Sequence, residues 1–88
     1  MRKAEEALME ALSLIKGDRQ AQYGKPQENF ARIAERWEQQ INDELPPWRV
    51  CAMMADLKMA RMSGTGYHRD SAVDAIAYLA LMVMLAEE

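Results

Sequence analysis

Apolar side chains recur every three or four residues along most of the chain, the spacing that places them on one face of a helix. The pattern predicts four helices, at about residues 2–16, 26–41, 47–62 and 70–87. Gly17 suits the end of the first helix, and Pro26 and Pro47 suit helix starts, where the missing proline N–H would be unpaired anyway. Residues 63–66, SGTG, are expected to form a loop. Because no stretch alternates with period two, we expect an all-α fold, a compact four-helix domain over residues 1–88.

Each predicted helix has apolar positions that are expected to face a core. They are Leu8, Leu12 and Ile15; Phe30, Ile33, Trp37 and Ile41; and Val50, Met53, Met54, Leu57 and Ala60. The last helix is apolar on every side from Ala75 to Ala86, a run too short to cross a bilayer. A chain of 88 residues can bury such a helix on all sides only with help, so a homo-oligomer is expected.

Charge and cysteine content exclude several classes of protein. The net charge is −3 and the basic residues are scattered, which argues against binding extended nucleic acid, although a few arginines suffice for a small anion. The single cysteine, Cys51, and single histidine, His68, cannot form a disulfide or a zinc site within the chain. The lone thiol and the absence of an apolar leader indicate a reducing cytoplasm, with no membrane partner. Nucleophilic catalysis has little support, and no catalytic residue is assigned.

Two carboxylates and a phenol, Asp70, Asp74 and Tyr78, follow one another at spacing four and so share one face of an otherwise apolar helix. Burying carboxylates is unfavourable unless they are paired or bound to a cation. One interpretation is a helix cap, at Asp70 or Ser71, together with a salt bridge. The other is a ligand or metal site, and the sequence leaves both open.

Basic residues lie close to these carboxylates in the predicted fold. Lys58 and Arg61 share a face of the third helix and predict a solvated surface, an ion-pair network or a phosphate clamp. The glycine-containing loop before the last helix could present an anion site at the helix start, with Arg69 adding positive charge, or could be an ordinary connection.

The stretch YGKPQENF, residues 23–30, combines a turn with groups that recognise nucleotides. The Asn29 amide could bind a base or ribose edge, and Tyr23 or Phe30 could stack on a ring. Alternatively, Phe30 belongs to the core and Asn29 to the surface. In the next turns, Glu35 and Glu38 form an ExxE pair that could hold magnesium opposite a second carboxylate pair. Because they flank a core tryptophan, solvated glutamates are the favoured interpretation.

Three motifs occur in order: YGKPQENFARIAERW, ADLKMARM and HRDSAVDAIAYLAL. Together they resemble a family of small phage and prophage proteins, over residues 19–81. The resemblance implies a phage protein acting in the host cytoplasm. Its signature positions are Tyr23, Gly24, Asn29, Phe30, Lys58, Arg61, Asp70, Asp74 and Tyr78.

The segment DSAVDAIAYLAL is also similar to the last metal-binding helix of MazG-type all-α nucleotide pyrophosphohydrolases. That resemblance implies a magnesium ion held by Asp70, Asp74, Glu35 and Glu38. The chain departs from the MazG pattern, since its last pair is DxxxD, and a two-metal mechanism needs several converging carboxylates. By analogy with phage sponges, which are small helical oligomers that sequester nucleotide signals of host defence, the residues suit holding a nucleotide better than hydrolysing one.

Three hypotheses follow. The first is a non-enzymatic, cofactor-free binder of a small cyclic or NAD-derived nucleotide. Its phosphates would be held by Lys58, Arg61 and Arg69, its ribose or base edges by Asn29, Asp70 and Asp74, and its ring by Tyr23 or Tyr78. The second is a magnesium-dependent pyrophosphohydrolase. The third is a structural or protein-binding module in which every polar pair is a salt bridge.

Overall fold

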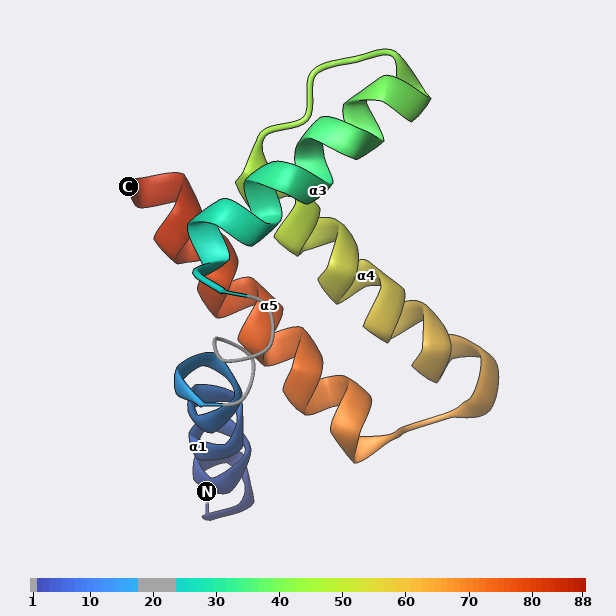
Figure 1. The fold of residues 1–88 in the computed structure, drawn as a ribbon. Helices are drawn as coiled ribbons and strands as arrows, with labels where there is room; N and C mark the ends of the chain where they lie inside the picture. Colours follow the sequence, from blue (N-terminus) through green and yellow to red (C-terminus); the bar gives the residue numbers. More distant parts are fainter. Residues whose placement is uncertain (1, 18–23) are drawn as a thin grey trace.

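The computed structural model describes residues 2–17 and 24–88, which form four helices and no strand (Figure 1). The helices are α1 (Arg2–Lys16), α3 (Pro26–Ile41), α4 (Pro47–Thr65) and α5 (Arg69–Glu87). The prediction of a compact all-α fold with four helices is therefore confirmed. None of the helices in these two ranges is long and apolar enough to cross a membrane.

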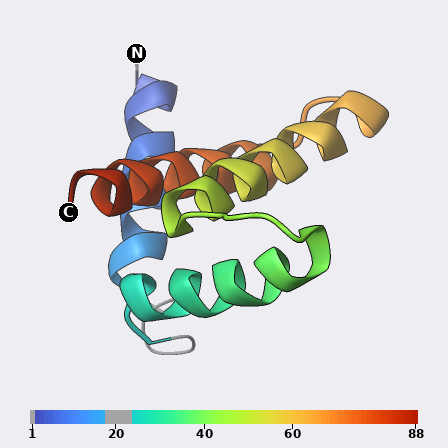
Figure 2. The same cartoon turned by 90° about the horizontal axis from the view of Figure 1, so that it is seen from above.

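An antiparallel hairpin of α4 and α5 forms the centre of the molecule. α3 packs against α4, and α1 crosses α5 on the side away from α4 (Figure 1, Figure 2). α3 lies on one side of the hairpin and crosses it at a steep angle (Figure 1), and α1 crosses it steeply on the α5 side (Figure 2). α1 is thus attached to the rest of the described chain mainly through α5.

Proline and a left-handed residue set the limits of α3. Pro26 and Pro47 each occupy the first turn of a helix, as predicted. α3 ends at Asn42, which has a φ of 56° and donates its N–H to the Glu38 carbonyl at 2.8 Å. The Glu38 carboxylate also accepts the Leu45 N–H at 2.6 Å, so it ties the connection to α4 back onto α3.

The end of α4 differs from the prediction, because the helix continues to Thr65 instead of ending at Met62. The Ser63 and Thr65 hydroxyls donate to carbonyls one turn earlier, at 3.3 and 3.0 Å, so these residues are accommodated inside the helix. The helix stops at Gly66, whose φ of 91° is a conformation that glycine adopts readily. The loop is therefore shorter than the SGTG stretch indicated.

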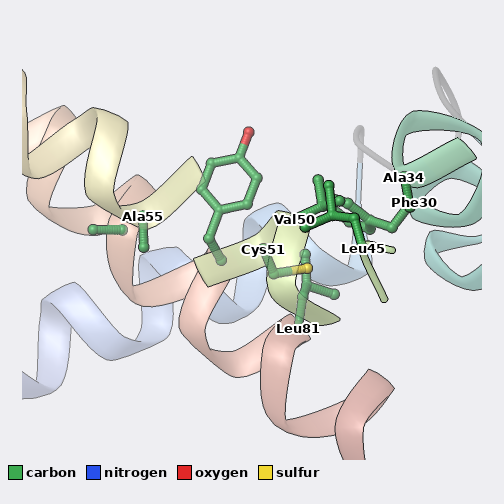
Figure 3. Packing of buried hydrophobic residues seen from close by; sticks show 9 residues of the cluster. Phe30, Ala34, Leu45, Val50, Cys51, Ala55 and Leu81 are labelled. Atoms are coloured by element: carbon green, nitrogen blue, oxygen red, sulfur yellow. The ribbon is translucent and has the colours of Figure 1, made fainter. Parts of the chain in front are cut away.

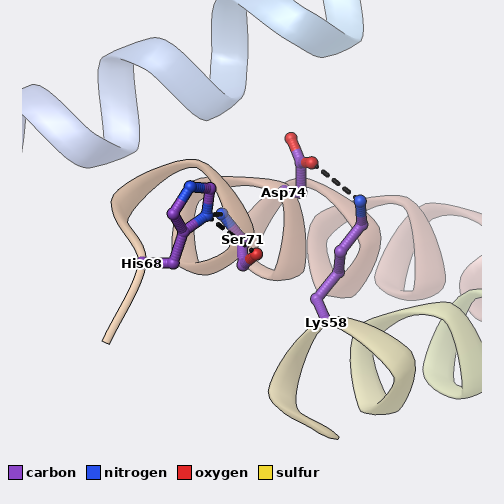
Figure 4. Close-up of polar contacts among 4 residues, drawn as sticks. All are labelled: Lys58, His68, Ser71 and Asp74. Carbon is purple, nitrogen blue, oxygen red and sulfur yellow. Dashed lines mark hydrogen bonds and ion pairs between the residues drawn. The ribbon is translucent and has the colours of Figure 1, made fainter. Parts of the chain in front are cut away.

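The cap of α5 also differs from the prediction. His68 precedes the helix and accepts the Ser71 N–H at 3.4 Å through Nδ1, which also lies 3.1 Å from the Ser71 hydroxyl (Figure 4). Asp70 lies in the first turn, where a negative charge suits the helix dipole, and is not the cap. The imidazole takes the capping position because it lies one residue before the first helical turn.

The main core lies where α3, α4 and α5 meet (Figure 3). Its buried members are Phe30, Ala34, Leu45, Val50, Cys51, Ala55, Ala75, Tyr78 and Leu81. Phe30 meets Tyr78 edge to face, with ring centroids 6.3 Å apart and planes at 83°, a favourable aromatic geometry. A smaller cluster of Ala11, Val73 and Ala77 packs α1 against α5.

Several residues predicted to face the core are exposed instead. On α1, Ala11 is buried while Leu8 and Leu12 are exposed, because the small side chain allows α1 to lie close to α5. On the other helices, the exposed members of the predicted apolar faces are Ile41, Met53, Leu57 and Ala60. α4 and α5 carry apolar residues on most sides, so periodicity could not identify which side meets its neighbours.

Candidate functional site

A polar pocket of about 450 Å³ lies between α1 and α5. It is lined by Glu10, Ser13, Leu14, Asp70, Val73 and Asp74. The three α5 residues follow the spacing of one helix face, and three of the six lining residues are carboxylates. The volume falls within the range of small-molecule sites. The structure thus brings two predicted site residues, Asp70 and Asp74, into one pocket.

Asp74 is held by a cation from the neighbouring helix. Lys58 Nζ on α4 lies 3.0 Å from Asp74 Oδ2 on α5, and the two side chains are 15% and 34% exposed (Figure 4). Of the two alternatives left open for this carboxylate, the salt bridge is therefore present. Lys58 is not itself a lining residue, so its charge acts next to the pocket through its ion pair with Asp74.

A second ion pair links the start of α5 to α1. Arg69 donates to the Glu10 carboxylate, and both side chains are about half exposed. The hydrogen bond and the charge of Glu10 raise the pKa of Arg69 above its ordinary value, so the guanidinium stays charged at any working pH. Two of the lining carboxylates, Asp74 and Glu10, are therefore each paired with a cation.

Two predicted site residues, Arg61 and Asp70, belong to neither of these ion pairs. Arg61 does not line the pocket. It is exposed on α4 one helical turn beyond Lys58, and no carboxylate within residues 2–17 and 24–88 forms an ion pair with it. Asp70 is exposed in the pocket, and the same ranges contain no ion pair for it either. One cation and one carboxylate near this part of the hairpin are thus available to a ligand.

Other predicted ligand residues lie away from the pocket. Tyr78 is only 7% exposed and belongs to the core with Phe30, which leaves its ring little surface for stacking. Asn29 is half-buried on α3, which begins beside the end of α5, where Gln27 donates to Glu88 at 3.1 Å. Asp70 lies at the opposite end of α5, a helix roughly 28 Å long. Tyr23 falls outside the described residues.

The predicted magnesium ligands are divided between two elements. Glu35 is exposed on α3, and Glu38 binds the Leu45 backbone, whereas Asp70 and Asp74 lie in the first half of α5. Figure 1 shows α3 at the end of the hairpin away from the start of α5. In the part of the chain that the structure describes, no three histidine, cysteine or carboxylate side chains are grouped to hold a metal ion.

Sequence patterns did not indicate four of the six pocket residues, of which two, Glu10 and Ser13, are polar. Both are exposed positions on α1, and nothing in their spacing distinguishes them from other solvated residues. Only the packing of Ala11 against Val73 and Ala77 brings this side of α1 over Asp70 and Asp74. The pairing of Glu10 with Arg69 can be recognised only once the tertiary fold is known.

Residues 6–86 match the family described as Domain of unknown function (DUF6378). The Gene 55 protein of Mycobacterium phage D29 is 40% identical over 85 residues, which are 97% of this chain and 56% of that protein. The Gene 55 protein of Mycobacterium phage L5 is 38% identical over 76 residues, 85% of this chain and 49% of that protein. The chain thus spans about half the length of these curated relatives.

No solved structure matches the chain. The resemblance to phage proteins is confirmed, because both relatives come from bacteriophages. The family match covers nearly all of the described residues, including α4, all but the last residue of α5, and both sides of the pocket. This chain is therefore a member of the DUF6378 family.

Proposed function

We propose that this protein binds a small nucleotide in the pocket between α1 and α5 and holds it without hydrolysing it. The observation that carries the proposal is the charge arrangement of this pocket. Three lining carboxylates face about 450 Å³, and two of them are paired with cations from neighbouring positions, Lys58 and Arg69. A nucleotide presents both phosphates and hydrogen-bond donors, so it needs groups of both signs close together.

Arg61 is the proposed first contact for the phosphates, because its side chain is exposed and forms no ion pair with the described carboxylates. A guanidinium binds phosphate oxygens through two parallel hydrogen bonds. Lys58, one turn away, adds a second charge when a phosphate competes with Asp74. Within the pocket, Asp70 can accept hydrogen bonds from ribose hydroxyls or base N–H groups.

The proposed role is sequestration of a host nucleotide signal, cyclic or NAD-derived, in the host cytoplasm. Support comes from the phage relatives and from a pocket whose lining offers charged and hydrogen-bonding groups. Under this proposal the protein is an anti-defence sponge that acts as a homo-oligomer. It needs no cofactor and binds neither extended nucleic acid nor a membrane.

A structural module is the second candidate, and one observation favours it. Two of the cations near the pocket are already paired with protein carboxylates, Lys58 with Asp74 and Arg69 with Glu10. A chain whose ion pairs serve only to hold its helices together would have this arrangement. It would bind no nucleotide, and its charged residues would influence stability alone.

The proposal is tested by a thermal-shift screen against cyclic dinucleotides, cyclic ADP-ribose isomers and nucleoside triphosphates, with and without magnesium. The ligand is then recovered from the denatured protein and analysed by chromatography. We expect a stabilising nucleotide that needs no magnesium and is recovered intact. A ligand that needs magnesium and is recovered cleaved would instead indicate a MazG-like pyrophosphohydrolase, with Glu35, Glu38, Asp70 and Asp74 brought together in an assembly of several chains. No stabilisation by any nucleotide would favour the structural module.

A further inference from the structure

The side of the α4–α5 hairpin away from α3 is apolar and exposed. On α5, Leu79 and Val83 are 45% and 50% exposed, although they lie in the middle of an uncharged run. Ala72 and Ala86 lie seven residues before and after Leu79, so they share its side of the helix. On α4, Met59 is 54% exposed, and Ala52 lies seven residues before it.

Both sets of residues lie on the same side of the hairpin. Each residue of a helix points about 100° further round the helix axis than the residue before it. In two antiparallel helices, the residues that come directly after the contact residues therefore point to the same side of the pair. Met59 follows Lys58, which binds Asp74 across the hairpin, and Leu79 follows Tyr78 of the core. Figure 2 shows α3 on the other side. The N-terminal part of α1 projects on this side next to α5, and α4 carries no helix there.

We propose that this face, defined by Ala52, Met59, Ala72, Leu79, Val83 and Ala86, pairs with the same face of a second copy. Two antiparallel hairpins that meet in this way form a four-helix bundle around a twofold axis. The small alanines let the helices approach closely, and the larger side chains of Met59, Leu79 and Val83 fill the space between them.

Charge and surface area select a second copy as the occupant. The six residues of the face are uncharged, and the exposed carboxylate of Asp56 lies at its border next to Ala52 and Met59. Two copies can therefore meet through the six residues without bringing like charges into direct contact, even though each chain has a net charge of −3. The chain exposes 6405 Å², whereas a compact monomer of its mass is expected to expose about 5,300 Å². The difference, about 1,100 Å², is close to the roughly 800 Å² that each partner buries in an interface of standard size.

This dimer is independent of the proposed nucleotide binding. It uses the side of α5 that carries Leu79 and Val83, whereas the pocket lies under α1 at Asp70 and Asp74. A dimer that binds no nucleotide would contradict only the proposed nucleotide binding. A monomer that binds a nucleotide would contradict only the proposed dimer.

The test is the mass of the full chain in solution, measured by light scattering on a size-exclusion column. We expect twice the 10.1 kDa of one chain for the wild type and the mass of one chain for Leu79→Glu, with the helical circular-dichroism spectrum retained. The matched control is Ile41→Glu, at an equally exposed apolar residue at the end of α3, and it should remain dimeric. A monomeric wild type, a dimer that Leu79→Glu leaves intact, or a dimer that both variants disrupt to the same extent would overturn the proposal.

A second measurement applies if Leu79→Glu fails to fold. Leu79→Cys keeps the face apolar, and Cys51 is fully buried, so the new thiol is the one that a cross-linker reaches in the described chain. A short bismaleimide should join two copies of Leu79→Cys in high yield and leave Ile41→Cys mostly single. Equal yields for the two variants would contradict the proposed face.

Discussion

Lys58 Nζ on α4 lies 3.0 Å from Asp74 Oδ2 on α5, so a single ion pair joins the two helices of the central hairpin at the edge of the pocket. The lysine is the more buried partner, at 15% exposure. This pair connects the stability of the fold with the proposed binding of nucleotide, because the same lysine holds Asp74 and lies one turn from Arg61.

Removing the carboxylate should destabilise the protein measurably. Asp74→Ala removes the partner of the largely buried Lys58 side chain, and we expect a loss of about 1–2 kcal/mol, between the values for surface and buried pairs. Urea unfolding of Asp74→Ala, Lys58→Ala and the double variant gives the coupling energy. Additive effects of the two single changes would show that the pair contributes nothing.

Among the residues that the structure describes, Phe30 is the largest fully buried side chain, and its ring packs edge-on against Tyr78. Phe30→Ala should reduce the free energy of unfolding by about 3–5 kcal/mol, through lost burial and a new cavity. That loss is a large share of the stability of a small domain, so the thermal unfolding midpoint should fall steeply. Phe30→Leu keeps most of the volume and should lose less than about 2 kcal/mol. A similar loss for both variants would place the effect elsewhere than in the cavity.

Two neighbouring glycines should respond to alanine in opposite directions. Gly66 has a φ of 91° and a ψ of −175°, a region almost restricted to glycine, so Gly66→Ala should destabilise the protein by about 1–3 kcal/mol. Gly64 lies within α4, and a Cβ there meets no atom within 4 Å, so Gly64→Ala should stabilise it by up to about 1 kcal/mol. Chemical unfolding of both variants measures this difference. A destabilising Gly64→Ala would indicate that residues 63–65 are a loop, as the sequence pattern first predicted.

Glu10→Gln should strengthen nucleotide binding while leaving the fold intact. Glu10 and Arg69 are both well exposed, so their pair adds little to stability, and the unfolding midpoint should stay within about 2 °C of the wild type. The change removes a negative charge from the pocket and releases Arg69 for a phosphate, which should raise the affinity about two- to fivefold. Titration calorimetry at low and high salt checks this, because the gain should shrink as salt screens the charges. Unchanged or weaker binding would place the phosphates elsewhere.

Local signals in the sequence were sufficient to predict the helices but not to predict which face of each helix is buried. Pro26, Pro47 and Gly17 marked helix limits that the structure has, because proline and glycine act on the backbone within a turn. The extension of α4 to Thr65 was missed, since Ser63 and Thr65 can bond either in a loop or back to the preceding helical turn. On α4 and α5 the apolar residues lie on most sides, so the core could not be assigned from periodicity.

The pocket could be predicted only in part for a related reason. Asp70 and Asp74 share a helix, so their proximity follows from spacing alone. Their neighbour Glu10 lies about 60 residues earlier, and only the packing of Ala11 on α5 brings it to the pocket. Conversely, Asn29 and Tyr78 looked like ligand residues by type, although the fold separates the first from the pocket and buries the second.

The measurement that tests nucleotide binding most directly is calorimetric titration, in the presence of EDTA, of the most stabilising nucleotide from the thermal-shift screen. The wild type is compared with Arg61→Ala and with Arg36→Ala, a control at an exposed arginine on α3. We predict binding without metal, a loss of at least about tenfold for Arg61→Ala, equivalent to about 1.4 kcal/mol, and no change for Arg36→Ala. Absence of binding in the wild type, or equal losses in the two variants, would contradict a nucleotide site beside Arg61.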